Sequence, residues 1–349
     1  MICFTVCSNN YLAEALTLGQ TLKQHASKPV EFLIFLTDKY ISEIDYKSLS
    51  SKVIEVTDEI TPGYLEITSK YNIIELSTAI KPGVCKYLFN TYAGEDTVLY
   101  FDPDICLFND VSLIDEEFGD STILLTPHNL KPVPVGTQPF ENVFLNFGIY
   151  NLGFIGLKRS TNAFDLLNWW EQRTMQFGII KPEEGFFVDQ LWLTLAPIYF
   201  EGIKVSYHTG LNTAYWNINE RQLALENEKY VVNGTHPLVF FHFSSFDFTL
   251  KKLAKRSSYT EPTFDKSALI KGMKYYKQLL ELNNYTFYHK FKPYYSVTFD
   301  NYIAREFPNG PSKGKLEQIK KMVKIMPQSF NRGLVNLGHI ISKLNDFKG

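Results

Sequence analysis

Short apolar runs alternate with amphipathic segments along the first 250 residues of the chain. Runs rich in β-branched and aromatic residues predict buried strands at 2–7, 30–36, 53–56, 97–101, 123–125 and 239–243. Apolar residues that recur near every 3.6 positions predict helices at 12–22, 75–92, 164–176 and 187–195. In the second of these, Pro82 marks the first turn or a kink. This alternation is typical of an α/β fold with a mostly parallel central sheet. In such sheets ligands bind at the carboxyl ends of the strands, which directs attention to residues 8–11 and 102–104.

The pattern changes near residue 250, so we expect an α/β domain over 1–250 and a helical, basic C-terminal extension over 251–349. From Pro311 onward eight basic residues stand against two acidic ones, whereas residues 1–310 carry a net charge of −8. This asymmetry indicates an anionic partner for the tail. Apolar positions interleaved with the lysines suit either an anionic membrane surface or a helical cap with a solvated charged face.

Composition excludes several broad classes of protein. The chain has 349 residues, of which 45% are hydrophobic, so it can bury a full core. A net charge of −2 argues against a nucleic-acid partner bound through bulk positive charge. No apolar run is long enough for a transmembrane helix, and the first residues do not resemble a signal peptide. The four cysteines form no CxxC pair, which favours free thiols and a cytoplasmic location.

The strongest local motif is Asp102-Pro103-Asp104, directly after an expected strand. In extended backbone, residues two positions apart point the same way, so both carboxylates can face one ion. Carboxylate oxygens suit Mg²⁺ or Mn²⁺, which usually bridge substrate phosphates. The competing interpretation is a turn that closes the strand, with Pro103 fixing its geometry. The glycine-rich phosphate loops of dinucleotide and P-loop sites are absent from the sequence.

Three further segments each have a structural and a functional interpretation. Asp189-Gln190 begins an apolar segment, either as a helix cap or as a polar pair for sugar hydroxyls. His242 lies in an apolar strand and is either a satisfied core residue or a metal ligand. Residues 210–217 mix aromatic rings with amides, as carbohydrate sites and ordinary half-buried loops both do. The candidate acceptor or sugar-binding residues there are Asn212, Tyr215, Trp216 and Asn217.

In their order along residues 1–250, these motifs resemble the GT-A glycosyltransferases. The resemblance is greatest to the glycogenin and lipopolysaccharide galactosyltransferase type (family eight) and to related bacterial polysaccharide-cluster transferases. It rests on Ser8-Asn9-Asn10-Tyr11, Ala79–Lys86, Asp102-Pro103-Asp104, Asn151-Leu152-Gly153-Phe154, Asp189-Gln190 and His242. It implies a Rossmann-like nucleotide-diphospho-sugar transferase fold in which residues 1–250 form the catalytic domain.

The resemblance also implies roles for individual residues. Mn²⁺ or Mg²⁺ would be held by Asp102, Asp104 and His242, and the catalytic residues would be Asp189, Gln190 and Asn151. The nucleotide would be bound by Thr5, Cys7, Ser8, Asn10, Tyr11, Lys86 and Asp102. Two departures stand out. Lys86 replaces a common arginine, and Phe243-Ser244-Ser245 follows His242 where the family usually continues with Gly and then Lys-Pro-Trp.

The expected function is therefore metal-dependent transfer of a sugar from a nucleotide-sugar donor, with UDP-sugars favoured. The acceptor would be a glycan or lipid-linked glycan in polysaccharide, lipopolysaccharide or capsule biosynthesis in a bacterium. The resemblance implies retention of configuration; in an inverting enzyme Asp189 would instead be a candidate general base. Two alternatives stay open: a non-catalytic glycan-binding module, and a nucleotidyltransferase that makes sugar nucleotides. The latter would usually carry a glycine-rich loop after the first strand, and residues 8–11 lack glycine.

Overall fold

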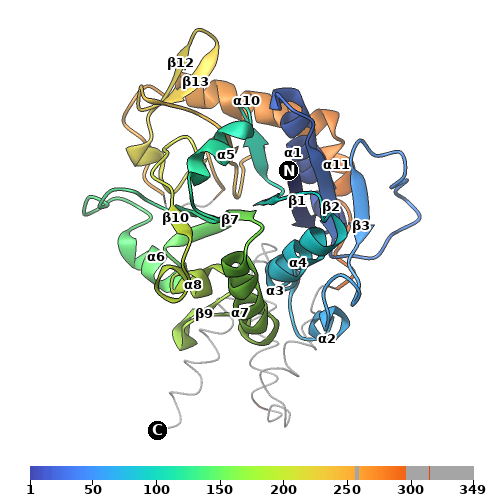
Figure 1. The fold of residues 1–349 in the computed structure, drawn as a ribbon. Coiled ribbons are helices and arrows are strands. Elements are labelled where there is room, and N and C mark those ends of the chain that lie inside the picture. The colour runs from blue at the N-terminus through green and yellow to red at the C-terminus, as the bar shows by residue number, and fades with distance from the viewer. Residues whose placement is uncertain (256–258, 296–313, 315–349) are drawn as a thin grey trace.

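A computed structural model describes residues 1–255, 259–295 and Gly314. Its centre is a seven-stranded sheet with the order β10-β6-β7-β4-β1-β2-β3 (Figure 1). The strands are β1 (Ile2–Cys7), β2 (Glu31–Leu36), β3 (Lys52–Glu55), β4 (Thr97–Phe101), β6 (Ile123–Pro127), β7 (Tyr150–Lys158) and β10 (Ile203–Val205). Neighbouring strands run parallel except for β7, which is antiparallel to both β4 and β6. The predicted α/β fold with a mostly parallel sheet is confirmed.

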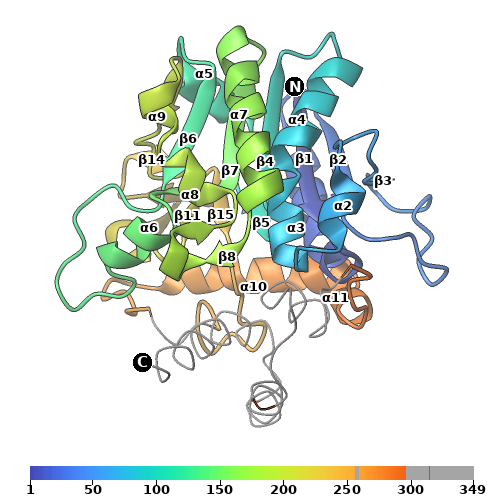
Figure 2. The ribbon, with the colours of Figure 1, turned by 90° about the horizontal axis from the view of Figure 1, so that it is seen from below.

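Helices cover both faces of this sheet, as Figures 1 and 2 show. The helices on one side include α3 (Ile73–Ala79), α4 (Lys81–Thr91) and α7 (Thr161–Phe177), and those on the other include α1 (Leu12–His25) and α5 (Ser112–Phe118). Helix α10 (Ser267–Leu282) packs against α1. Side chains alternate between the two faces along β1: Phe4 packs in the core of the α7 side and Cys3 in the core of the α1 side. The sheet is therefore buried on both faces, which explains its nearly continuous apolar strands.

The structure describes further, mostly short elements. They are η1 (Asn9–Tyr11), α2 (Tyr64–Thr68), β5 (Ile105–Leu107), α6 (Glu141–Phe147), β8 (Ile180–Lys181), η2 (Pro182–Glu184), β9 (Phe186–Phe187), α8 (Gln190–Leu193), α9 (Ala196–Tyr199), β11 (Thr213–Ala214), η3 (Ile218–Glu220), β12 (Leu223–Glu226), β13 (Lys229–Val232), β14 (His236–Pro237), β15 (Phe240–His242) and α11 (Tyr285–Tyr288). The small sheet β11-β15-β5 matters most for the site, because it brings residue 242 beside residues 102–105.

Two of the predicted helices differ from the structure. The segment 75–92 was expected to be a helix with Pro82 at its first turn or at a kink; it is divided at Ile80 into α3 and α4, and Pro82 lies in the first turn of α4. Proline lacks the amide hydrogen that a continuous helix requires at this position. The helix expected at 187–195 is wrong for most of its length: β9 comes first, α8 spans only Gln190–Leu193, and α9 starts at Ala196.

The described part of the extension packs on the same core as the first 250 residues. Tyr276 of α10 is fully buried, and its ring stacks on Phe243 at a centroid distance of 4.1 Å. Packing is therefore continuous across residue 250 among the described residues. The basic tail after Pro311, apart from Gly314, lies outside the described residues. Within the part of the chain that is described, no helix is long and apolar enough to span a membrane.

Candidate active site

Two carboxylates and an imidazole converge where β4 ends. Asp102 follows β4 directly, and its backbone N–H donates to Gly153 O on β7 at 2.7 Å. His242 ends β15, which pairs with β5 so that His242 lies opposite Ile105. The ligand atoms of Asp102, Asp104 and His242 all lie within 4.8 Å of one another. Nε2 of His242 is 3.0 Å from Asp104 Oδ1 and 3.7 Å from Asp102 Oδ2.

The tautomer of His242 is set by its other ring nitrogen. Nδ1 lies 3.2 Å from Oδ1 of Asn212, a carbonyl oxygen that can only accept, so Nδ1 carries the hydrogen. When the imidazole is neutral, the Nε2 lone pair therefore faces the two aspartates. Burial alone would lower the pKa of His242, but Asp104 and Asp102 raise it above the ordinary value.

Asn212 is oriented by a chain of buried amides. Its Nδ2 donates to Asn151 Oδ1 at 3.0 Å and to Thr126 Oγ1 at 2.9 Å. Asn151 Nδ2 in turn lies 3.3 Å from Nε2 of His128. Burial lowers the pKa of His128 to about 4, so this imidazole is neutral near pH 7 and its Nε2 can accept from Asn151. Each amide thus has one orientation that satisfies its neighbours, and the chain fixes the ring of His242.

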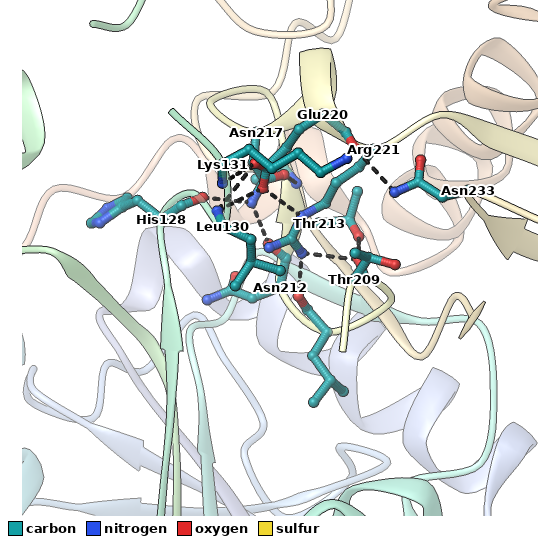
Figure 3. Close-up of polar contacts among 12 residues, drawn as sticks. His128, Leu130, Lys131, Thr209, Asn212, Thr213, Asn217, Glu220, Arg221 and Asn233 are labelled. Carbon is teal, nitrogen blue, oxygen red and sulfur yellow. Dashed lines mark hydrogen bonds and ion pairs between the residues drawn. The ribbon is translucent and has the colours of Figure 1, made fainter. Parts of the chain in front are cut away.

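The loop that carries Asn212 is held from behind by a buried arginine, drawn in Figure 3. Nη1 of Arg221 donates to Thr209 O at 2.9 Å and to Leu211 O at 2.5 Å, and the side chain is 1% exposed. Asn217 Nδ2 donates to the carbonyl oxygens of Asn212 and His128, each at 3.0 Å. The loop is therefore tied along its length, which fixes the position of Asn212.

A buried ion pair lies against the carboxylate cluster. Lys81, in the first turn of α4, is 2% exposed, and its Nζ lies 2.8 Å from Asp189 Oδ2 and 3.5 Å from Asp102 Oδ1. Burial alone would lower the pKa of Lys81, but the carboxylates of Asp102 and Asp189 raise it above the ordinary value. Nζ also donates to Leu152 O at 2.8 Å and sits 4.4 Å from the ring centre of Tyr100. Lys81 thus links Asp189 to Asp102.

The lysine expected at the site lies elsewhere. The ammonium of Lys86 lies 3.2 Å from Asn168 Oδ1 and within 2.5 Å of Glu171 Oε2, both on α7, so the structure does not bring it into the cluster. Lys81, which was not predicted, comes from the same segment five residues earlier. A lysine inside the apolar run Ala79–Cys85 is the signal that could have identified it, because a buried lysine needs an ionic partner.

The other expected sugar-site residues lie near the cluster but differ in exposure. Gln190 is partly exposed, and its Nε2 donates to Phe147 O at 2.7 Å. Trp216 packs edge-on against the His242 ring at 5.1 Å and is only 6% exposed. Tyr215 is also buried, beside Tyr259. The aromatic residues of the 210–217 loop thus belong largely to the packing around His242.

The expected nucleotide-binding residues lie where β1 ends and around η1. Thr5 and Cys7 are buried within β1, and burial raises the pKa of the Cys7 thiol. Ser8 Oγ donates to Asn10 Oδ1 at 2.6 Å, whereas Tyr11 is 39% exposed. Sequence inspection missed Asp38 after β2, which is fully buried and accepts from the Asn9 backbone N–H at 2.8 Å. This bond sets the path of the chain through η1.

The donor set of the cluster fits a divalent cation. Two carboxylates and a neutral imidazole with Nε2 turned toward them are oxygen and nitrogen ligands of the kind that Mn²⁺ accepts. The amide that fixes the histidine from behind is the outer-shell contact typical of ligating histidines. The carboxylates of Asp102 and Asp104 are partly exposed and so accessible from solvent. Among the described residues this is the one group of three or more such side chains.

Comparisons with known proteins give distant likenesses. No protein-family model matches the chain. Two uncharacterized proteins of Bacillus subtilis (strain 168) are similar to it: YfnF is 25% identical over 246 residues (69% of this chain, 80% of YfnF), and YfnD is 23% identical over 256 residues (71% and 78%).

Solved structures with partial similarity include glycosyltransferases. The galactosyltransferase LgtC, in complex with donor and acceptor sugar analogues, matches at 12% identity with a TM-score of 0.47, covering 81% of this chain and 96% of LgtC. Mouse xyloside xylosyltransferase 1 matches at 15% identity with a TM-score of 0.38, covering 61% of this chain and 86% of that one.

Proposed function

We propose that this protein is a metal-dependent glycosyltransferase that uses a nucleotide-sugar donor, with UDP-sugars favoured, and a glycan or lipid-linked acceptor. One observation carries the proposal: two aspartates and a histidine of fixed tautomer converge at the carboxyl edge of the sheet, against a buried Lys81–Asp189 pair. The Asp102–Asp104–His242 cluster suits a cation that bridges phosphates. The Lys81–Asp189 ion pair places a fixed carboxylate beside this cluster. The order of the sequence motifs agrees with this interpretation.

Asp102, Asp104 and His242 would hold the ion, Mn²⁺ or Mg²⁺, which when bound neutralises negative charge on a departing diphosphate. Burial raises the pKa of Asp189, and the ammonium of Lys81 at 2.8 Å opposes this rise by favouring the ionised carboxylate. Asp189 thereby presents a fixed negative charge that stabilises positive charge developing on the donor sugar. Gln190, next to Asp189 in the chain and partly exposed, would orient a sugar hydroxyl, whereas the amide of Asn151 acts through Asn212 on His242.

In the reaction we propose, the bond between the anomeric carbon and the diphosphate oxygen breaks, and a bond from the acceptor oxygen to that carbon forms. With retention of configuration, the acceptor proton passes to the departing diphosphate. The protein's part is to position donor and acceptor and to stabilise the separated charges. A glycan-binding module is not favoured, because Tyr215 and Trp216 are 8% and 6% exposed and offer little open aromatic surface for a sugar.

The test is release of nucleoside diphosphate from a panel of nucleotide sugars, with Mn²⁺, with Mg²⁺ and with a chelator. We expect turnover of one donor class that the chelator abolishes and that Asp104→Asn lowers by at least 100-fold. NMR of the product then reports the anomeric configuration. Turnover that is equal with and without chelator, or equal in Asp104→Asn, contradicts the proposal. The absence of turnover with every donor does so as well, if none of the nucleotides binds.

For the tail we propose docking on an anionic membrane surface, which would bring the enzyme close to lipid-linked acceptors on the cytoplasmic face. This rests on the excess of lysines from Pro311 onward, outside the described residues. We expect the full chain to co-sediment with vesicles containing anionic lipid and a variant lacking 311–349 to stay in the supernatant. Equal sedimentation of the two proteins contradicts the docking role.

A further inference from the structure

Part of the C-terminal extension crosses the end of the sheet where β1 and β2 finish. Helix α11 lies against η1 and α1, and the chain then continues to Tyr295. Figure 1 shows α11 beside α1 and β2, at the far end of α10 from β12 and β13. This places residues 285–295, which we call the strap, next to η1.

The first attachment of the strap is a histidine–carboxylate contact. Nε2 of His289 lies 2.8 Å from Oε1 of Glu14, in the first turn of α1. Glu14 is 5% exposed, so its carboxylate has little contact with water and depends on protein partners. The imidazole ring is thereby held in a defined orientation at the surface of the strap.

The second attachment is the buried carboxylate of Asp38. One oxygen accepts from the backbone N–H of Asn9 in η1, at 2.8 Å, and the other accepts from the backbone N–H of Tyr294, at 2.6 Å. A single side chain therefore joins η1 to the strap. The ring of Tyr295 adds contacts to Tyr64, at 6.0 Å, and to the ammonium of Lys39, at 5.7 Å. The strap is thus fixed at both ends.

A group of three aromatic rings lies where the strap meets η1. The ring centres of His289 and Tyr285 are 3.9 Å apart, and those of His289 and Tyr11 are 5.9 Å apart. Tyr11 is 39% exposed, so the group has an open side. Tyr11 lies in η1, which follows β1, and Asp102 follows the neighbouring parallel strand β4, so the rings and the carboxylates lie at the same edge of the sheet. An elongated ligand could therefore span from the rings to the carboxylates.

We propose that the strap forms one wall of the donor site and that the His289 ring, together with Tyr11, contacts the nucleoside half of the donor. This deepens the proposed function and rests on it. A nucleoside diphosphate has the matching chemistry, because its base offers a flat face for stacking on aromatic rings and its diphosphate would reach the cation ligands. The extension would then complete the site that residues 1–250 begin.

The test separates the two halves of the ligand. Binding of UDP and of inorganic diphosphate, each with Mn²⁺, is measured by calorimetry for the full chain and for the variants His289→Ala and His289→Gln. The glutamine keeps a hydrogen-bond donor for Glu14 but lacks the ring, so it distinguishes stacking from folding. Lys271→Ala, on the exposed side of α10, is the matched control in the extension. If UDP does not bind, GDP, CMP and dTDP are used in the same way.

We expect both His289 variants to bind the nucleotide about 5- to 100-fold more weakly, the range that loss of one base–ring stack gives. Their affinity for inorganic diphosphate should equal that of the wild type, and Lys271→Ala should change neither. Equal nucleotide binding in wild type and both His289 variants overturns the proposal, and so does an equal loss for nucleotide and diphosphate, since that indicates a distorted fold. Failure of the wild type to bind any nucleotide contradicts the proposed function itself.

Discussion

Gly153 is the position at which one added methyl group should disturb the proposed metal site most. This glycine lies on β7, and its carbonyl oxygen accepts from the backbone N–H of Asp102. A Cβ built at Gly153 would lie 2.3 Å from Cε1 and 2.6 Å from Nδ1 of His242. It would also lie 2.8 Å from Oδ1 of Asn151. The variant Gly153→Ala therefore pushes on both the histidine and the amide chain that orients it.

The size of the effect follows from these distances. The closest contact is 1.1 Å shorter than an ordinary contact of 3.4 Å, so the His242 ring must move by about that amount. Overpacking of this kind costs about 1–3 kcal/mol of unfolding free energy. Displacing a ligand through its surroundings typically weakens metal binding by about 10- to 100-fold. We expect both effects in Gly153→Ala, with a lower melting temperature and weaker binding of Mn²⁺.

Gly156→Ala is the matched control, because it overpacks the same strand at a distance from the metal site. Its added Cβ would lie 2.6 Å from Cζ of Phe118. Titration of Mn²⁺, followed by loss of the free-ion signal in electron paramagnetic resonance, measures the affinity of both variants. We expect Gly156→Ala to lose stability yet bind Mn²⁺ like the wild type. Unchanged Mn²⁺ affinity in Gly153→Ala, or an equal loss in both variants, would refute the reasoning.

Three further predictions concern the surroundings of the site. Lys81→Met leaves Asp189 buried without its cation and should lower the free energy of unfolding by about 3–5 kcal/mol. In urea denaturation the double variant Lys81→Met/Asp189→Asn should recover most of this loss. No recovery would contradict the assignment of the loss to the unpaired Asp189. Burial lowers the pKa of His128 from 6.5 to about 4, so between those pH values the unfolded chain binds a proton that the folded chain does not. The free energy of unfolding should therefore decrease by up to about 3 kcal/mol as the pH is lowered from 6.5 to 4. His128→Gln should show a smaller loss between pH 6.5 and 4 in the same denaturation series, and an identical loss would exclude His128 as its source. Arg221→Met should lower the free energy of unfolding by about 2–4 kcal/mol, because two buried carbonyl oxygens lose their donor. It should also weaken Mn²⁺ binding, because the loop that carries Asn212 is held less firmly. An unchanged Mn²⁺ affinity, measured by paramagnetic resonance, would show that the loop does not position the site.

Local patterns predicted five strands of the central sheet and the edge where the candidate site lies, but not β7 or β10. The apolar run at 97–101 is β4 residue for residue, and Asp102 and Asp104 follow it as the motif indicates. The long-range pairing of β15 with β5 was not predictable, because register between distant strands is set by tertiary packing. His242 was therefore a candidate on its sequence alone, and the structure adds its position beside the aspartates.

The residues that the sequence did not reveal are those whose chemistry depends on distant partners. Lys81 is separated by 21 positions from Asp102 and by 108 from Asp189, and no local pattern joins them. Asp38 and His289 are likewise noticeable only once the strap is seen against η1. The expectation for Lys86 came from the resemblance, but α4 starts at Lys81 and Lys86 contacts α7.

The most direct test of the central proposal is a thermal-shift measurement on the wild type and on Asp104→Ala. UDP, GDP, CMP and dTDP are each added with and without Mn²⁺. We predict that one nucleotide raises the melting temperature only with Mn²⁺ and only in the wild type. At a hundred times the dissociation constant the stabilisation is about 2.7 kcal/mol, which corresponds to a shift of about 4 °C for a chain of 349 residues. No shift with any nucleotide at millimolar concentration, or the same shift in Asp104→Ala, would contradict a cation-dependent nucleotide-sugar site.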